Sequence, residues 1–188
     1  MNDTKQKLLN SARDLFYRHG FQATGVDAIA KAAGTTRQTL YNHFENKDQL
    51  AVEVVRHRDA LWRKELREQT KLRGGDDAAA QLLSIFEILR EWFSNDGFAG
   101  CLFIGAAIEF PSATDPIHKA AKANFDAIRV LIAEIASKNR FLDPQSFAEK
   151  FNIIIEGAIV AELMDRNLDA ANQAAELAAI LIERYCSE

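Results

Sequence analysis

Apolar side chains recur every three or four residues along most of the chain, and this spacing constrains the fold more than any other feature. An α-helix gathers residues at this spacing on one face, whereas a half-buried strand needs strict alternation. The intervals of four, three and four residues are seen at Leu82, Phe86, Leu89 and Phe93. Alternating β-branched runs are few, and only three prolines and nine glycines interrupt 188 residues. The sequence therefore predicts an all-α chain.

Start and stop signals divide this pattern into nine predicted helices. Glycines that tolerate positive φ end the first two, at Gly20 and Gly34. Residues 24–27 resemble a capping box that opens the second helix, and either Thr35 or Thr36 can cap the third. Six further helices are predicted: from Asn46 toward Lys71, over 82–93 after the linker 74–77, over 103–110 before Pro111, and from Asp115-Pro116, Asp143-Pro144 and Asp169 onward, the last ending near Tyr185.

Several function classes are excluded by what the sequence lacks. Charges interrupt every hydrophobic stretch before the roughly 18 residues of a membrane span, and the first residues have no apolar core like that of a signal peptide. The cysteines, Cys101 and Cys186, are too few for a disulfide framework or a four-ligand zinc site. The four histidines are scattered, and the sequence contains neither a Gly-x-Ser-x-Gly elbow nor a Gly-rich phosphate loop. We therefore expect a reduced, cytoplasmic, non-enzymatic protein without metal, other cofactor or membrane partner.

The densest functional pattern lies between residues 24 and 47. Two short predicted helices joined by Gly34-Thr35-Thr36 form a helix-turn-helix, which presents its second helix to the DNA major groove. That helix buries only Leu40 and Phe44, and its other side chains form hydrogen bonds: Arg37, Gln38, Thr39, Tyr41, Asn42 and His43. Arginine can pair with guanine, glutamine or asparagine with adenine, and the threonine methyl can contact thymine. Thr24, Tyr41 and Lys47 suit phosphate oxygens.

The charge distribution agrees with a DNA-facing end. Residues 1–47 carry seven basic and four acidic side chains, a net charge of +3, whereas the remainder of the chain carries −7. A molecule with one polyanion-facing end has this distribution. The alternative is a solvated polar face on a helical ligand-binding or scaffold protein that never contacts DNA. These residues alone leave both interpretations open.

Residues 20–47 resemble the DNA-binding signature of TetR/AcrR-type transcriptional regulators, in the pattern Gly20-Phe21-x-x-Thr24-x-Val26-x-x-Ile29-Ala30-x-x-Ala33-Gly34-Thr35-x-x-x-Thr39-Leu40-Tyr41-x-His43-Phe44-x-x-Lys47. The resemblance implies a homodimeric repressor. Its three-helix DNA-binding domain would occupy residues 1–47 and continue into the start of the long fourth helix. Residues 48–188 would form a helical domain for ligand binding and dimerisation.

The same resemblance implies roles for individual residues. Tyr41, and with it Thr24, His43 and Lys47, would bind the DNA backbone, with Thr35, Thr36 and Thr39 in the same interface. Base readout would fall to Arg37, Gln38 and Asn42, and the two recognition helices of the dimer would meet successive major grooves of a pseudo-palindromic double-stranded operator. An inducer that favours a spacing of the two DNA-binding domains that does not fit the operator would release the DNA. Gly25 and Asp27 depart from the family pattern of Thr and Arg, and Asp27 would repel phosphate.

Two apolar stripes mark the eighth predicted helix. One consists of Phe147, Phe151, Ile154 and Ala158, and the other of Ile153, Gly157, Val160 and Met164. A helix that is apolar on two faces must bury both, one of them against something other than its own core. The ninth helix has the same character, with Leu177, Ile180 and Leu181, and the small residues Gly157 and Ala161 permit close approach. We predict a four-helix bundle in a homodimer; a well-buried helix in a monomer is the alternative.

Many of the twelve phenylalanines cluster between residues 86 and 151. Core packing is the ordinary explanation, and a pocket for a small apolar or aromatic inducer is the functional one. Its candidate lining residues are Phe86, Leu89, Phe93, Cys101, Phe103, Phe110, Phe125 and Phe151, with Glu109 and Glu156 as candidate polar groups. Cys101 stands at a predicted helix start, where free N–H groups favour a reactive thiolate. Redox sensing at Cys101 is therefore an alternative to simple packing.

Overall fold

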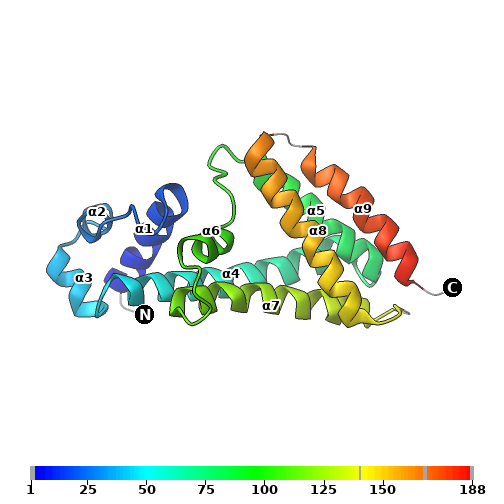
Figure 1. Ribbon diagram of the computed structural model, residues 1–188, viewed down its shortest axis with the longest axis horizontal. Helices are drawn as coiled ribbons and strands as arrows, with labels where there is room; N and C mark the ends of the chain where they lie inside the picture. The colour runs from blue at the N-terminus through cyan, green and yellow to red at the C-terminus, as the bar shows by residue number, and fades with distance from the viewer. Residues whose placement is uncertain (1–2, 140, 167–168, 187–188) are drawn as a thin grey trace. The chain divides into compact units, whose positions relative to one another are not determined.

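The computed structural model describes residues 3–139, 141–166 and 169–186. Within these residues lie nine α-helices and one isolated antiparallel bridge, between Phe141 and Cys186. The helices are α1 (Asp3–His19), α2 (Val26–Ala32), α3 (Arg37–His43), α4 (Lys47–Gly74), α5 (Ala78–Phe93), α6 (Leu102–Glu109), α7 (Pro116–Ala136), α8 (Pro144–Asp165) and α9 (Ala170–Tyr185) (Figure 1). The predicted all-α class and the predicted helix order are confirmed.

The chain divides into two compact units. The head unit comprises Met1–Leu61 and Cys101–Asn124, and the body unit comprises Trp62–Gly100 and Phe125–Glu188. These limits differ from the predicted domains 1–47 and 48–188, because residues 48–61 of α4, the helix α6 and the first part of α7 group with the head. The helices α4 and α7 each contribute residues to both units.

The head unit is built on the apolar faces of α1, α2 and α3. Its core contains large side chains that are at most 2 % exposed: Leu8, Phe16, Phe21, Ile29, Leu40 and Phe44. Phe21 stacks on Phe16 with ring centroids 4.7 Å apart, and it meets Phe110 edge-on at 5.8 Å. The end of α6 is therefore part of the core that supports the helix-turn-helix.

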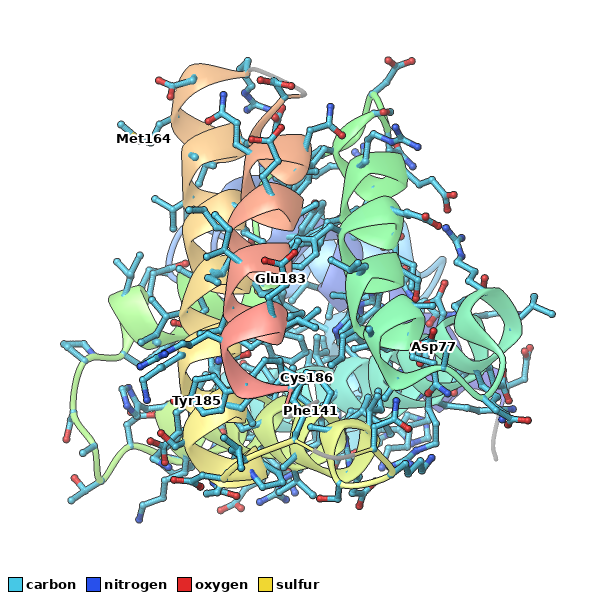
Figure 2. The ribbon with its side chains drawn as sticks, turned by 90° about the vertical axis from the view of Figure 1, so that its right-hand side faces the viewer. Asp77, Phe141, Met164, Glu183, Tyr185 and Cys186 are labelled. Atoms are coloured by element: carbon cyan, nitrogen blue, oxygen red, sulfur yellow. The ribbon has the colours of Figure 1, made fainter. Side chains whose placement is uncertain are left out.

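In the body unit, α8 packs along α9, and both contact α5 (Figure 2). Phe151 of α8 lies between Phe86 of α5 and Phe147, with ring centroids 5.4 Å and 5.2 Å away. The buried face of α9 consists largely of small residues, including Ala171, Ala174 and Ala178. Small side chains allow the helix axes to approach closely. The three helices therefore share one apolar core.

Most predicted helix ends are confirmed, but the capping box at residues 24–27 is wrong. The N-cap of α2 is Gly25, which offers no side-chain acceptor, and the hydroxyl of Thr24 instead donates to the carbonyl of Gly20 at 2.7 Å. Of the two candidate caps of α3, Thr36 is the one used. The fourth helix extends to Gly74, one turn beyond Lys71. The starts of α7 and α8 lie at Pro116 and Pro144, as predicted.

Candidate nucleic-acid interface

The exposed face of α3 is polar. Arg37, Gln38, Tyr41 and Asn42 are exposed, whereas Thr39 and His43 are half-buried. On the opposite side of this segment, Leu40 and Phe44 are buried in the core of the head unit. The side-chain amide of Gln38 donates to the Oδ1 atom of Asn42 at 3.2 Å, so the two side chains lie together on the surface one turn apart. This face offers the hydrogen-bonding groups that base edges in the major groove can pair with.

The turn before α3 is set by Gly34, Thr35 and Thr36. Gly34 adopts a φ of +65°, a left-handed conformation that glycine accepts without strain. The amide of Thr35 donates to the carbonyl of Ala30 at 2.9 Å. The hydroxyl of Thr36 accepts from the amide of Thr39 at 3.1 Å, which caps the helix. The hydrogen bonds of Thr35 and Thr36 thus stabilise the turn that sets the orientation of α3.

Arg37 is held by two neighbours on the same surface. Its Nη1 atom lies 3.6 Å from the Oδ2 atom of Asp27, and its guanidinium lies over the Tyr41 ring, 5.6 Å from the centroid. Asp27 therefore faces a cation of α3, which offsets part of the repulsion that the acidic residue would exert on a nearby phosphate. Both side chains are exposed, so the pair is weak and can open when a ligand arrives.

Two predicted phosphate contacts, Thr24 and Lys47, make hydrogen bonds within the head. Thr24 is buried, with its hydroxyl turned to Gly20. The ammonium of Lys47 donates to the carbonyls of Phe21 at 2.9 Å, Thr24 at 3.1 Å and Gln22 at 3.4 Å. In this structure the two side chains shape the α1–α2 turn, so a contact of Lys47 with phosphate would require its ammonium to leave these carbonyls.

Glu109 of α6 binds backbone N–H groups of the same turn. Its Oε1 atom accepts from the amide of Phe21 at 2.9 Å, and its Oε2 atom accepts from the amide of Gln22 at 2.7 Å. Glu109 is one of two candidate polar groups for the predicted ligand pocket; in the structure its carboxylate instead accepts hydrogen bonds from these two amides. Its partners lie 87 and 88 residues away in the sequence, and no local pattern signals such a contact.

The predicted pocket residues fall in both units. Phe86, Leu89, Phe93, Phe125 and Phe151 belong to the body unit, and Cys101, Phe103 and Phe110 to the head unit. Phe110 packs on Phe21, and Cys101 is the half-buried N-cap residue of α6. Glu156 is half-buried, and burial raises the pKa of its carboxyl group against the opposing effects of Arg129 and Asn152. The pocket among these residues stays a prediction.

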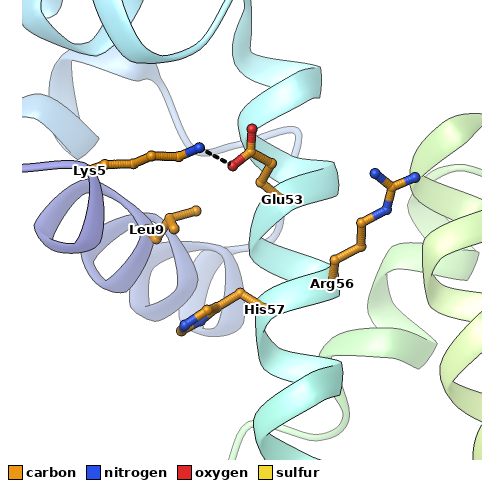
Figure 3. Close-up of a pocket in the computed structure, with 5 residues that line it drawn as sticks. All are labelled: Lys5, Leu9, Glu53, Arg56 and His57. Carbon is orange, nitrogen blue, oxygen red and sulfur yellow. Dashed lines mark ion pairs between the residues drawn. The ribbon is translucent and has the colours of Figure 1, made fainter. Parts of the chain in front are cut away.

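A different hollow lies between α1 and α4 in the head unit. It has a volume of about 340 Å³ and is lined by Lys5, Leu9, Glu53, Arg56 and His57 (Figure 3). The ammonium of Lys5 is paired with the carboxylate of Glu53 at 2.7 Å. None of the predicted inducer-binding residues lines it.

The predicted dimer residues form an exposed apolar face on α8 and α9. Ile153, Val160, Met164 and Leu177 are exposed, as is Gly157, while Ala161 and Leu181 are half-buried. Met164 is 75 % exposed and projects from the end of α8 away from the bundle (Figure 2). Exposed apolar patches of this kind mark interaction surfaces in proteins.

In the described part of the chain, no cluster of three His, Cys, Asp or Glu side chains could hold a metal ion. Among the described helices, none combines the length and apolar character that crossing a bilayer requires.

A helix-turn-helix with an exposed polar second helix, attached to a larger helical unit, defines a class of DNA-binding regulators. A family model described as bacterial regulatory proteins of the tetR family matches residues 8–54, and one described as a tetracyclin repressor-like C-terminal domain matches residues 78–178. This chain belongs to the TetR family of bacterial transcriptional regulators, which are non-enzymatic DNA-binding proteins.

Relatives extend over nearly the whole chain. The regulator YjdC of Escherichia coli is 24 % identical over 178 residues, covering 92 % of this chain and 91 % of its own length. The uncharacterized regulator YxaF of Bacillus subtilis is 24 % identical over 185 residues, covering 97 % and 96 %. Among solved structures, SCO4454, a TetR-family regulator from Streptomyces coelicolor, has a TM-score of 0.87 at 23 % identity, covering 100 % of this chain and 98 % of its own. This likeness bears on the fold alone.

Proposed function

We propose that this chain is a homodimeric repressor, acting in the cytoplasm, that binds a pseudo-palindromic DNA operator through α3 and is released by a small apolar or aromatic inducer. The observation that carries the proposal is the exposed face of α3, where Arg37, Gln38, Tyr41 and Asn42 lie together on a helix that is firmly docked on its other side. The exposed apolar face of α8 and α9 supports dimerisation. The phenylalanine-rich interior of the body unit supports an apolar ligand.

The proposal is tested by selecting bound duplexes from a random DNA pool and measuring affinities by fluorescence anisotropy. We expect two related half-sites and an affinity that falls linearly on a log–log plot against salt concentration, because phosphate contacts release counterions. Gln38→Ala and Asn42→Ala should each lower the affinity for the selected sequence about tenfold and relax the preference for one base pair. Tyr41→Ala should weaken binding to all duplexes alike.

The matched control is Lys64→Ala, which removes an exposed charge from the part of α4 in the body unit. This variant should bind the selected duplex like the original chain. Lys47→Ala is a poor probe, because it also removes three hydrogen bonds from the α1–α2 turn. If no duplex is retained in dilute buffer, or if the α3 variants bind like the control, the proposal fails.

A further inference from the structure

Glu162 of α8 has a buried oxygen atom without a hydrogen bond. Its side chain is 2 % exposed, and its Oε2 atom has no hydrogen-bond partner among the described residues. Among the buried side-chain nitrogen and oxygen atoms of those residues, it alone is in this state. Burying a carboxyl oxygen without a partner is unfavourable, and such groups call for a specific explanation. A ligand that donates the missing hydrogen bond to this oxygen would be such an explanation.

The helix geometry directs Glu162 into the body unit. Ile155, Ala158 and Ile159 lie seven, four and three residues before it, on one buried face of α8. Residues at these spacings share one side of a helix. Glu162 therefore continues the inward face of α8, where the residues that precede it, Ile155, Ala158 and Ile159, are apolar and have no side-chain hydrogen-bond donor.

The segment that follows α5 covers the last turn of α8 (Figure 1). The guanidinium of Arg166 donates to the carbonyl of Phe98 at 2.9 Å. Gly100 lies so close to Leu163 that an added Cβ would stand 3.1 Å from the Cδ2 atom of that leucine. Arg166, one turn after Glu162, thus uses its guanidinium to bind the carbonyl of Phe98.

Aromatic rings gather at this segment. The ring centroid of Phe98 lies 5.0 Å from that of Trp92 and 5.1 Å from that of Phe93, and Trp62 lies 6.3 Å from Trp92. The guanidinium of Arg166 already lies 5.9 Å from the Phe98 centroid, so this ring accommodates a cation. The faces of aromatic rings attract ammonium groups, especially away from water.

We infer that the carboxylate of Glu162 binds the ammonium group of a ligand inside the body unit. This ligand carries a protonated amine on an aromatic or apolar framework. The ammonium group donates a hydrogen bond to the Oε2 atom, and its organic part packs on the aromatic cluster. This inference deepens the proposed function and rests on it where the ligand is identified with the inducer. It assigns the inducer a positive charge that the phenylalanines alone do not require.

The test uses three arylalkylamines as probes, namely benzylamine, 2-phenylethylamine and 4-phenylbutylamine, each with the corresponding alcohol. Thermal unfolding and titration calorimetry are measured on the full chain. At least one amine should raise Tm by about 3 °C at ten times its Kd, and its alcohol should have a much smaller effect. Glu162→Gln should abolish the response. Glu149→Gln, which neutralises an exposed acid on the same helix, should retain it.

A second readout guards against misfolding of the variant. If the carboxyl group awaits a ligand, Glu162→Leu should leave Tm of the ligand-free chain unchanged or raise it, because an unpaired buried oxygen is removed. If Glu162→Gln and Glu162→Leu both lower Tm by several degrees, and Arg166→Gln does so non-additively with them, Glu162 is a structural partner of Arg166 and the inference is wrong. It is also wrong if no amine binds, or if amine and alcohol bind equally.

Operator binding separates this inference from the proposed function. Amines that bind through Glu162 to a chain that retains no duplex would support the inference and overturn the regulatory proposal. A chain that binds its operator, but responds only to uncharged molecules, would support the regulatory proposal and overturn the inference.

Discussion

At the scale of single residues, two opposite charges hold one turn. The carboxylate of Glu109 accepts from the amides of Phe21 and Gln22, while the ammonium of Lys47 donates to the carbonyls of Phe21, Gln22 and Thr24. Hydrogen bonds to charged groups are the stronger ones in proteins. The turn that joins α1 to the helix-turn-helix is therefore fixed on both sides by charges carried by α4 and α6.

Glu109→Ala should increase hydrogen exchange at the Phe21 and Gln22 amides by about tenfold or more, because each amide loses a charge-assisted bond of about 1.5–3 kcal/mol. The measurement is residue-resolved amide exchange. Glu176→Ala, which removes an exposed acid from α9, is the control and should leave both amides unchanged. Equal exchange in Glu109→Ala and the original chain would show that the carboxylate does not hold the turn in solution.

At the scale of elements, α3 depends on its ends. It has seven residues, too few for a helix to be stable in isolation, so its conformation rests on the Gly34 turn, the Thr36 cap and the burial of Leu40. The glycine stop and the buried positions follow from sequence pattern alone. The choice between Thr35 and Thr36 as the N-cap does not follow from the pattern, because both threonines lie within two residues of the helix start at Arg37.

Thr36→Ala should lower the free energy of unfolding by about 1 kcal/mol, because the amide of Thr39 loses its acceptor. Urea unfolding and operator affinity are the two measurements, and both should fall. Thr36→Ser keeps the hydroxyl and should restore most of the loss. Thr35→Ala serves as the control for the unfolding measurement, since its backbone amide, not its hydroxyl, makes the bond to Ala30. A larger loss in Thr35→Ala than in Thr36→Ala would contradict this account.

At the scale of the whole molecule, one apolar surface remains uncovered. Ile153 is 67 % exposed on α8, and other large apolar side chains of α8 and α9 are exposed as well: Val160, Met164, Leu177 and Ile180. Leaving several such side chains together in water is unfavourable, and a second copy of the chain would cover them. Nothing lies within 4 Å of a Cβ added at Gly157, so this part of α8 has room for a close partner.

Ile153→Glu should dissociate the proposed dimer, because a carboxylate would be buried in an apolar interface. Sedimentation at micromolar concentration should then change from twice the chain mass to the 21.0 kDa of one chain. Val130→Glu, which places the same charge on an apolar residue of α7 that is 52 % exposed, should remain dimeric. An original chain that already sediments at 21.0 kDa would refute dimerisation.

The sequence by itself determined the helices and the polar face of α3. Helix periodicity and terminal signals are local, so the spacing of apolar residues, Gly34 and the Pro starts of α7 and α8 could be recognised within a few positions. The capping box failed for a local reason as well: the hydroxyl of Thr24 finds the carbonyl of Gly20 four residues earlier, and this competing bond is not visible in the residue types.

Tertiary structure alone decided which polar groups meet across the chain. Glu109 accepts hydrogen bonds from a turn 87 residues away, and the ammonium of Lys47 donates to backbone carbonyls. The Oε2 atom of Glu162 becomes buried without a hydrogen-bond partner among the described residues. The grouping of α6 with the head, rather than with the body, is equally invisible to local pattern. Long-range contacts depend on how helices pack, and packing depends on the summed shape of many side chains, which no short stretch of sequence contains.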